Sequence, residues 1–180
     1  VYALGSFLEE RFPHEETPFY TAFFSSAGVE EAVKFLFLFF LIWGNRNFNE
    51  PLDGIVYGVF VSLGFAWAEN VIYVTHPILG GYETALERAL LSVPGHGLFG
   101  VRMGYYFALG KYRNRKRYLP LAFFSPYLAH ALYNYFLLKR EPVFWLFFSV
   151  LEVRLWVFGL KRIKELQNCS PFREKVSKES

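Results

Sequence analysis

The sequence contains few of the residues on which small secreted domains and many soluble enzymes depend. Its 180 residues include a single cysteine, Cys169, which excludes an intramolecular disulfide and a cysteine-rich metal site. Charged residues make up 19% of the chain, below the ~25% that is usual in soluble domains. The net charge of +3 is too small to indicate nucleic-acid binding. There is no HExxH pair, no clear Ser or Cys catalytic triad and no internal repeat. These absences leave a disulfide framework, a nucleic-acid-binding protein and a triad hydrolase without support.

Apolar and aromatic residues are abundant instead. The chain is 53% hydrophobic, with 22 Phe and 12 Tyr, and its mean hydropathy is +0.20. The charges gather between apolar runs of about 20 residues, the length that crosses a ~30 Å hydrocarbon core. This pattern predicts an all-α, polytopic transmembrane helix bundle of about five spans. The expected spans are Phe19–Trp43, Leu52–Val74, Glu83–Gly110 (interrupted at Pro94-Gly95), Tyr118–Leu138 and Val143–Leu160.

The distribution of Lys and Arg between the spans predicts the orientation in the membrane. The loop after the third span holds five basic residues between Lys111 and Arg117, and the C-terminal tail opens with three more. Cytoplasmic loops carry such an excess, so the tail should be cytoplasmic. The expected organisation is an outer segment at 1–18, which could be the tail of an upstream helix, a transmembrane domain at 19–160 and a basic cytoplasmic tail at 161–180.

A charged cluster, Glu30-Glu31-Ala-Val-Lys34, lies in the middle of the first apolar run. A charge near the bilayer centre costs at least ~2.5–3.5 kcal/mol, so such residues usually line a bundle interior or a water-filled cavity. Glu30 and Lys34 have the spacing and order of a helical ion pair, while Glu31 is turned by ~100° and needs another partner. Adjacent carboxylates in a low dielectric resist simultaneous ionisation, which suits one of them to acid–base catalysis. A buried structural salt bridge is the alternative.

Further polar residues interrupt the later apolar runs, namely Glu69 with Asn70, His96, and His130 with Asn134. Since His130 and Asn134 are one helical turn apart, they resemble a base or ligand beside an oxyanion donor. His96 begins a series of small residues spaced by four, a pattern typical of tight helix packing in membranes. His96 should therefore point into the bundle. Together these groups predict an active site inside the bundle.

The order of these motifs resembles that of the PrsW family of intramembrane proteases, over roughly residues 17–140. The segments at 50–58 and 92–97 carry the same resemblance. The family is distantly similar to the CAAX-processing, ABI-type membrane endopeptidases, whose motifs are EExxxR, FxxxH and HxxxN. The matching motifs here are EExxK (Glu30, Glu31, Lys34), FxxxEN (Phe65, Glu69, Asn70) and HxxxN (His130, Asn134).

The resemblance implies a peptidase that cuts a single-pass membrane protein, such as an anti-sigma factor, in a prokaryotic plasma membrane. The lipid bilayer and the substrate are then the expected partners, and nucleic acid is not. By position, the catalytic residues would be Glu30, Glu31, Glu69, His130 and Asn134, supported by Lys34, Asn70 and His96.

Two mechanisms remain open at the level of sequence. In one, a carboxylate activates water directly and His130 with Asn134 stabilises the oxyanion. In the other, a divalent metal activates the water, with zinc favoured. Catalytic zinc takes three His or carboxylate ligands plus a water. Glu30 or Glu31 could take part, and the favoured ligand set is Glu31, Glu69, His96 and His130.

Three other functions are weighed against the peptidase. An ABI-type prenyl-protein endopeptidase is disfavoured because Glu69 stands where those enzymes have a histidine. A proton-coupled transporter or channel could use the glutamates as a relay, but the paired broken helices of inverted repeats are not evident. A non-catalytic scaffold that only binds membrane proteins is the third alternative.

Overall fold

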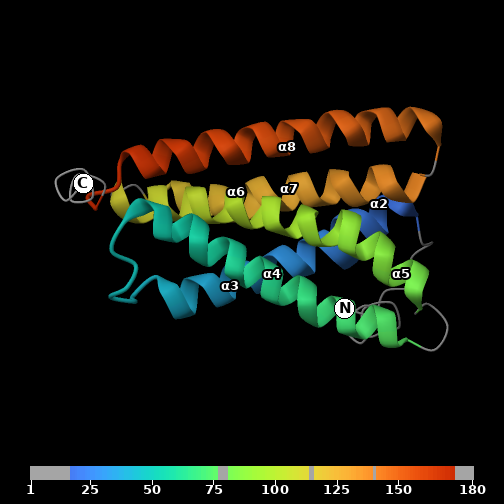
Figure 1. Ribbon diagram of the computed structural model, residues 1–180, viewed down its shortest axis with the longest axis horizontal. Helices are drawn as coiled ribbons and strands as arrows, with labels where there is room; N and C mark the ends of the chain where they lie inside the picture. The colour runs from blue at the N-terminus through green and yellow to red at the C-terminus, as the bar shows by residue number, and fades with distance from the viewer. Residues whose placement is uncertain (1–16, 77–80, 114–115, 140, 173–180) are drawn as a thin grey trace, which may run out of the picture.

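The computed structural model describes residues 17–76, 81–113, 116–139 and 141–172, and it contains helices and no strand in these ranges (Figure 1). The long helices run side by side along the length of the molecule, which confirms the predicted all-α bundle. Most of the predicted outer segment, residues 1–16, lies outside the described residues. The elements are α2 (Pro18–Tyr20), the π-helix η1 (Thr21–Gly28), α3 (Val29–Ile42), α4 (Pro51–Thr75), α5 (Tyr82–Glu87), the π-helix η2 (Arg88–Ser92), α6 (Val93–Tyr112), α7 (Tyr118–Lys139) and α8 (Pro142–Asn168).

Local sequence signals set where α4 begins. Pro51 occupies the first turn, where its missing N–H would have no intrahelical partner anyway. Glu50 and Asp53 form a reciprocal capping box, and the Glu50 backbone N–H donates to the Asp53 carboxylate at 3.0 Å. The helix ends at Thr75, before extended His76. The predicted span Leu52–Val74 is thus nearly coincident with α4.

The predicted interruption at Pro94-Gly95 is wrong. The chain stays helical from Tyr82 to Tyr112, and the irregularity is the π-helix η2, just before Pro94. A π-helical stretch accommodates a residue that cannot continue the regular ladder of hydrogen bonds. The Tyr133 hydroxyl of α7 donates to the Leu91 carbonyl of η2 at 3.0 Å, so a neighbouring helix also stabilises this π-helix.

Small residues bring α4 and α6 into close backbone contact. A Cβ atom on Gly104 would lie 2.0 Å from the carbonyl oxygen of Gly54, and one on Gly58 would lie 2.6 Å from that of Gly100. Only glycine fits at such distances, and small residues of this kind are the usual contacts between helices in membranes. The contact fixes α6, which carries His96, against α4, which carries Glu69.

The exterior is apolar and the interior holds charges. Phe40, Phe60 and Trp67 are more than two-thirds exposed, whereas the charged or ionisable side chains of Glu30, Glu31, Lys34, Glu69, His96 and His130 are buried. Two helices, Pro51–Thr75 and Pro142–Asn168, are long and apolar enough to cross a membrane by length and composition. The count of five spans stays a prediction. Helix α8 continues eight residues past the predicted end at Leu160, so the tail predicted at 161–180 begins as helix.

Candidate active site

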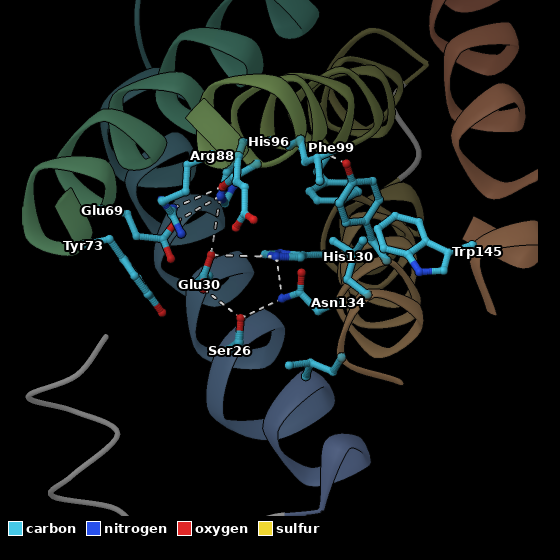
Figure 2. Close-up of a pocket in the computed structure, with 16 residues that line it drawn as sticks. Ser26, Glu30, Glu69, Tyr73, Arg88, His96, Phe99, His130, Asn134 and Trp145 are labelled. Atoms are coloured by element: carbon cyan, nitrogen blue, oxygen red, sulfur yellow. Dashed lines mark hydrogen bonds and ion pairs between the residues drawn. The ribbon is translucent and has the colours of Figure 1, made fainter. Parts of the chain in front are cut away.

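A cavity of about 660 Å³ opens at one end of the bundle (Figure 2). Its walls come from η1 and α3, the end of α4, the segment from α5 to the start of α6, the end of α7 and the start of α8. These parts lie together at the end of the molecule away from the C-terminus (Figure 1). Its size is in the range of small-molecule and peptide sites. Polar lining residues include Ser26, Glu30, Glu69, Arg88, His96, His130 and Asn134, and the apolar ones include Leu91, Phe99, Leu137, Leu138 and Trp145.

One side of the cavity is a chain of polar contacts that centres on His96. The Glu69 carboxylate oxygen Oε2 lies 2.8 Å from Arg88 Nη2 and 3.1 Å from His96 Nε2. On the other side of the same imidazole ring, Lys34 Nζ lies 2.7 Å from His96 Nδ1. His96 is thus held at both nitrogens, between a carboxylate of α4 and an ammonium of α3.

The chain of contacts continues from Lys34 to His130. The Lys34 ammonium donates to Glu31 Oε1 at 2.6 Å, and the same oxygen lies 2.9 Å from His130 Nδ1. The expected pairing of Lys34 with Glu30 is the weaker contact, at 3.6 Å. The i,i+3 spacing places Glu31 nearer to the ammonium here than the i,i+4 spacing places Glu30. Glu31 therefore both neutralises Lys34 and orients His130.

Asn134 of α7 and Ser26 of η1 connect His130 to Glu30. The Asn134 amide nitrogen Nδ2 lies 3.1 Å from His130 Nε2 and donates to Ser26 Oγ at 2.9 Å. The Ser26 hydroxyl donates to Glu30 Oε1 at 2.9 Å. The polar motif residues named from the sequence are therefore in one network, and Asn70 joins it through Arg88.

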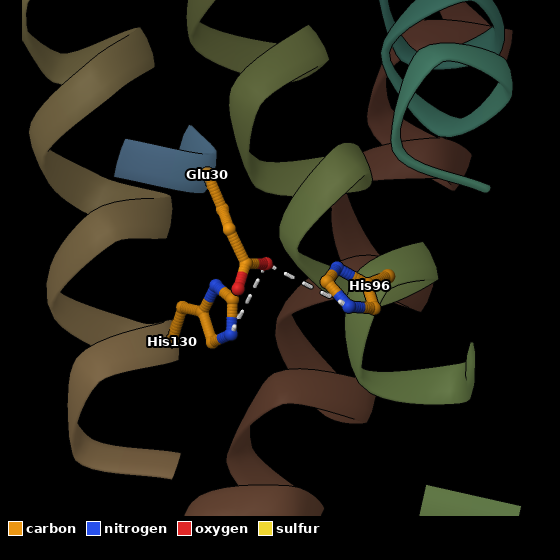
Figure 3. Close-up of side chains that lie close together, drawn as sticks. All are labelled: Glu30, His96 and His130. Atoms are coloured by element: carbon orange, nitrogen blue, oxygen red, sulfur yellow. Dashed lines mark ion pairs between the residues drawn. The ribbon is translucent and has the colours of Figure 1, made fainter. Parts of the chain in front are cut away.

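Two carboxylate oxygens of this network, Glu30 Oε2 and Glu31 Oε2, are buried and accept no hydrogen bond among the described residues. Glu30 Oε2 lies 3.6 Å from Lys34 Nζ and 3.9 Å from both His96 Nε2 and His130 Nε2 (Figure 3). Of the two glutamates, Glu30 is the one that lines the cavity. Buried carboxylate oxygens in proteins are normally paired. The three buried carboxylates outnumber the two cations, Lys34 and Arg88, by one. With neutral histidines, the site thus has an excess negative charge next to a carboxylate oxygen that accepts no hydrogen bond.

This arrangement suits a divalent metal. Glu30, His96 and His130 each offer one ligand atom, and these atoms lie within 4.8 Å of one another. Three His or carboxylate ligands are the usual protein share of a catalytic zinc site. The ligand set expected from the sequence differs, because Glu31 and Glu69 lie outside this group. Glu31 instead faces the far nitrogen of His130, as carboxylates behind metal-binding histidines do.

Two residues of the site went unnoticed in the sequence. Ser26 links Glu30 to Asn134, and its position four residues before Glu30 in a helical run could have indicated the contact. Arg88 binds both Glu69 and Asn70 across two helices. Nothing in the spacing of Arg88 along the sequence indicates a partner on α4.

A bundle that is apolar outside and holds a carboxylate–histidine centre inside fits the class of membrane-embedded hydrolases. The sequence model described as "PrsW family intramembrane metalloprotease" matches residues 2–159. The chain therefore belongs to the PrsW family, and is an integral membrane protein of a peptidase family. The match includes most of α8, so the resemblance extends beyond the predicted limit near residue 140.

Curated relatives agree with this assignment. The chain is 40% identical to Protease PrsW of Geobacillus kaustophilus over 152 residues, which are 83% of this chain and 65% of that protein. It is 37% identical to Protease PrsW of Bacillus subtilis over 154 residues, covering 83% and 68%. For Protease PrsW of Clostridioides difficile the identity is 32% over 156 residues, covering 84% and 66%. The chain thus spans about two-thirds of the length of these relatives. No solved structure matches it significantly.

Proposed function

We propose that this protein is an endopeptidase that hydrolyses a peptide bond of a single-pass membrane protein, in a prokaryotic plasma membrane. The observation that carries the proposal is Glu30 Oε2, which accepts no hydrogen bond and faces His96 and His130 inside a cavity open at one end of the bundle. The family name and the relatives, all bacterial proteins called protease, support the same chemistry.

In this proposal, Glu30, His96 and His130 hold the metal, and zinc is favoured because carboxylate and imidazole ligands suit it. Zinc held by these residues would supply Lewis-acid chemistry, by polarising the scissile carbonyl and making water a better nucleophile. Glu31 keeps His130 in place by accepting from its Nδ1–H. Asn134 lines the cavity, and its amide Nδ2 is a hydrogen-bond donor for the oxyanion that develops on the carbonyl oxygen.

Proton transfer is assigned to Glu69. Hydrolysis adds hydroxide to the carbonyl carbon and a proton to the leaving amine, so one group must take a proton from water and return it. Glu69 lines the cavity beside His96, and Arg88 and His96 hold its carboxylate in position. In the alternative without a metal, Glu30 is the base that activates water directly. Retention of activity after complete removal of the metal distinguishes the two mechanisms.

The position of the cavity supports cleavage on the outer side of the membrane. The cavity-lining residues belong to the helix ends that lie away from the C-terminus (Figure 1). With the basic C-terminal end in the cytoplasm, the cavity opens outward. Substrates would then be cut at or just beyond their outer membrane boundary. A membrane-anchored anti-sigma factor is the substrate type that the family resemblance favours.

The test is cleavage of a single-pass reporter protein by the purified chain in liposomes, with the fragments identified by mass spectrometry. We expect one cut near the outer boundary of the reporter span. Glu31→Gln should lower its rate at least about 10-fold, whereas Glu83→Gln, which changes an exposed glutamate on α5, should leave it intact. Equal cleavage by wild type and Glu31→Gln would contradict the proposal, and so would a cut at the cytoplasmic boundary.

A further inference from the structure

Arg88 lies on the wall of the cavity and connects two helices there. Arg88 is the first residue of η2, and its side chain contacts three groups of α4. These are the Glu69 carboxylate, the Asn70 side-chain carbonyl and the Tyr73 ring. Its side chain is 15% exposed, so the guanidinium is largely enclosed by these partners. Figure 2 shows Arg88 beside Glu69 and His96, on the side of the cavity opposite Asn134.

The geometry of these contacts requires a guanidinium group. Arg88 Nε donates to Asn70 Oδ1 at 2.5 Å, while Nη2 lies 2.8 Å from Glu69 Oε2 and 3.1 Å from Ser92 Oγ. Glu69 and Asn70 are adjacent in a helix, so their side chains point ~100° apart. A rigid fork with five N–H donors can reach both, whereas the single ammonium of a lysine cannot reproduce the two contacts.

The same contacts relate Arg88 to His96. Arg88 and His96 bind one oxygen atom, Glu69 Oε2, at 2.8 and 3.1 Å. The carboxylate can therefore hold the imidazole ring in place only while its own position is fixed. Among the described residues, Arg88 is the one Lys or Arg side chain within ion-pair distance of Glu69. Without it, the carboxylate would be free to turn toward the open part of the cavity.

We propose that Arg88 is a positioning residue, which fixes the Glu69 carboxylate in the cavity and, in the metal-free protein, holds the ring of His96 through it. The inference rests on the proposed peptidase function, because it assigns Arg88 a part in that reaction. Arg88 acts through Glu69 and does not touch the reacting atoms. Its loss should lower kcat and leave KM nearly unchanged, since the contacts that bind substrate remain.

The experiment compares Arg88→Lys, Arg88→Gln, Glu69→Gln and the double variant Arg88→Gln/Glu69→Gln. Arg88→Lys keeps the charge and removes the fork. Arg154→Lys is the matched control, because Arg154 is an exposed arginine on α8 away from the cavity. The first readout is kcat and KM on the reporter protein. The second is the ¹⁵N NMR spectrum of metal-free, histidine-labelled protein, in which the chain's four histidines give few signals.

We expect both Arg88 variants to lower kcat at least 10-fold, with KM changed less than about 3-fold, and the double variant to be no slower than the slower single variant. The His96 Nε2 signal should shift in the same direction in the Arg88 variants and in Glu69→Gln. Arg154→Lys should change neither this signal nor the kinetic constants. Raised KM with unchanged kcat, multiplied losses in the double variant, or an unmoved His96 signal would each overturn the inference. If the wild type cuts no substrate, the proposed function fails, and the NMR comparison still decides whether Arg88 positions His96.

Discussion

Glu30 and Glu31 face the two nitrogens of one imidazole ring, that of His130. Glu31 Oε1 lies 2.9 Å from Nδ1, whereas Glu30 Oε2 lies 3.9 Å from Nε2 and accepts no hydrogen bond. Adjacent residues of identical chemistry therefore have different surroundings. Glu31 is engaged by Lys34 and His130. Glu30 keeps one oxygen directed at the space between two histidines, and we assign to it the direct part in the reaction.

The network should behave as one catalytic unit. We expect Glu30→Gln, Glu69→Gln and His130→Ala each to lower kcat by a factor of about 10³ or more, and any double variant to lose little further activity, because residues that act together are not additive. Rates on the reporter protein, with thermal unfolding to show that each variant is folded, check this. Near-normal turnover of His130→Ala would refute the assignment.

Lys34 should be essential for stability as well as for the site. Its ammonium is fully buried and lies 2.6 Å from Glu31. Lys34→Met should destabilise the folded protein by roughly 3–5 kcal/mol, because it leaves a buried carboxylate without its cation. Adding Glu31→Gln should restore part of the loss. The measurement is unfolding in detergent, with Lys116→Met, at an exposed lysine, as the control that should change little.

The α4–α6 contact predicts opposite effects of the same substitution at two glycines. A Cβ on Gly104 would meet the Gly54 carbonyl oxygen at 2.0 Å, whereas one on Gly64 would meet nothing within 4 Å. Gly104→Ala should destabilise the bundle by about 1–3 kcal/mol through overpacking. Gly64→Ala should be neutral or stabilise it by up to about 1 kcal/mol, since alanine favours helix. Equal melting temperatures for the two variants would show that the helices are not in close contact.

The orientation can be tested with the native thiol, since Cys169 is the single cysteine of the chain and is exposed. It follows α8 at the basic end of the molecule. A membrane-impermeant maleimide should label it in inverted membrane vesicles and leave it unlabelled in intact cells. Labelling from outside the cell would show that the topology is the reverse of the predicted one, with the cavity open toward the cytoplasm.

Much of the fold follows from hydrophobic patterning. The predicted boundaries of the first, second and fourth spans lie within a residue or two of the helices, because charges and prolines mark the ends of apolar runs. The buried site residues were also recognisable, since Glu30, Glu69 and His130 interrupt apolar helices and have few other reasons to be there.

The contacts within the site were harder to predict from the sequence. Spacing along a helix favoured Glu30 as the partner of Lys34, yet the ammonium lies nearer to Glu31, because His96 and His130 on other helices also compete for these groups. The contact of Arg88 with Glu69 spans two helices and depends on the turn between them. Such pairings are set by tertiary packing, which a single sequence does not encode in its periodicity.

The most direct test of the proposed metal centre is the number of metal ions bound per chain, measured by elemental analysis of active wild type, Glu30→Gln and Glu31→Gln. We expect one divalent ion, zinc, in the wild type and none in Glu30→Gln, which lacks the free ligand oxygen. Glu31→Gln should still bind, about 10–100-fold more weakly, because it loses only the support of His130. Full activity of wild type without bound metal after chelation, or an undiminished ion content in Glu30→Gln, would contradict the assignment.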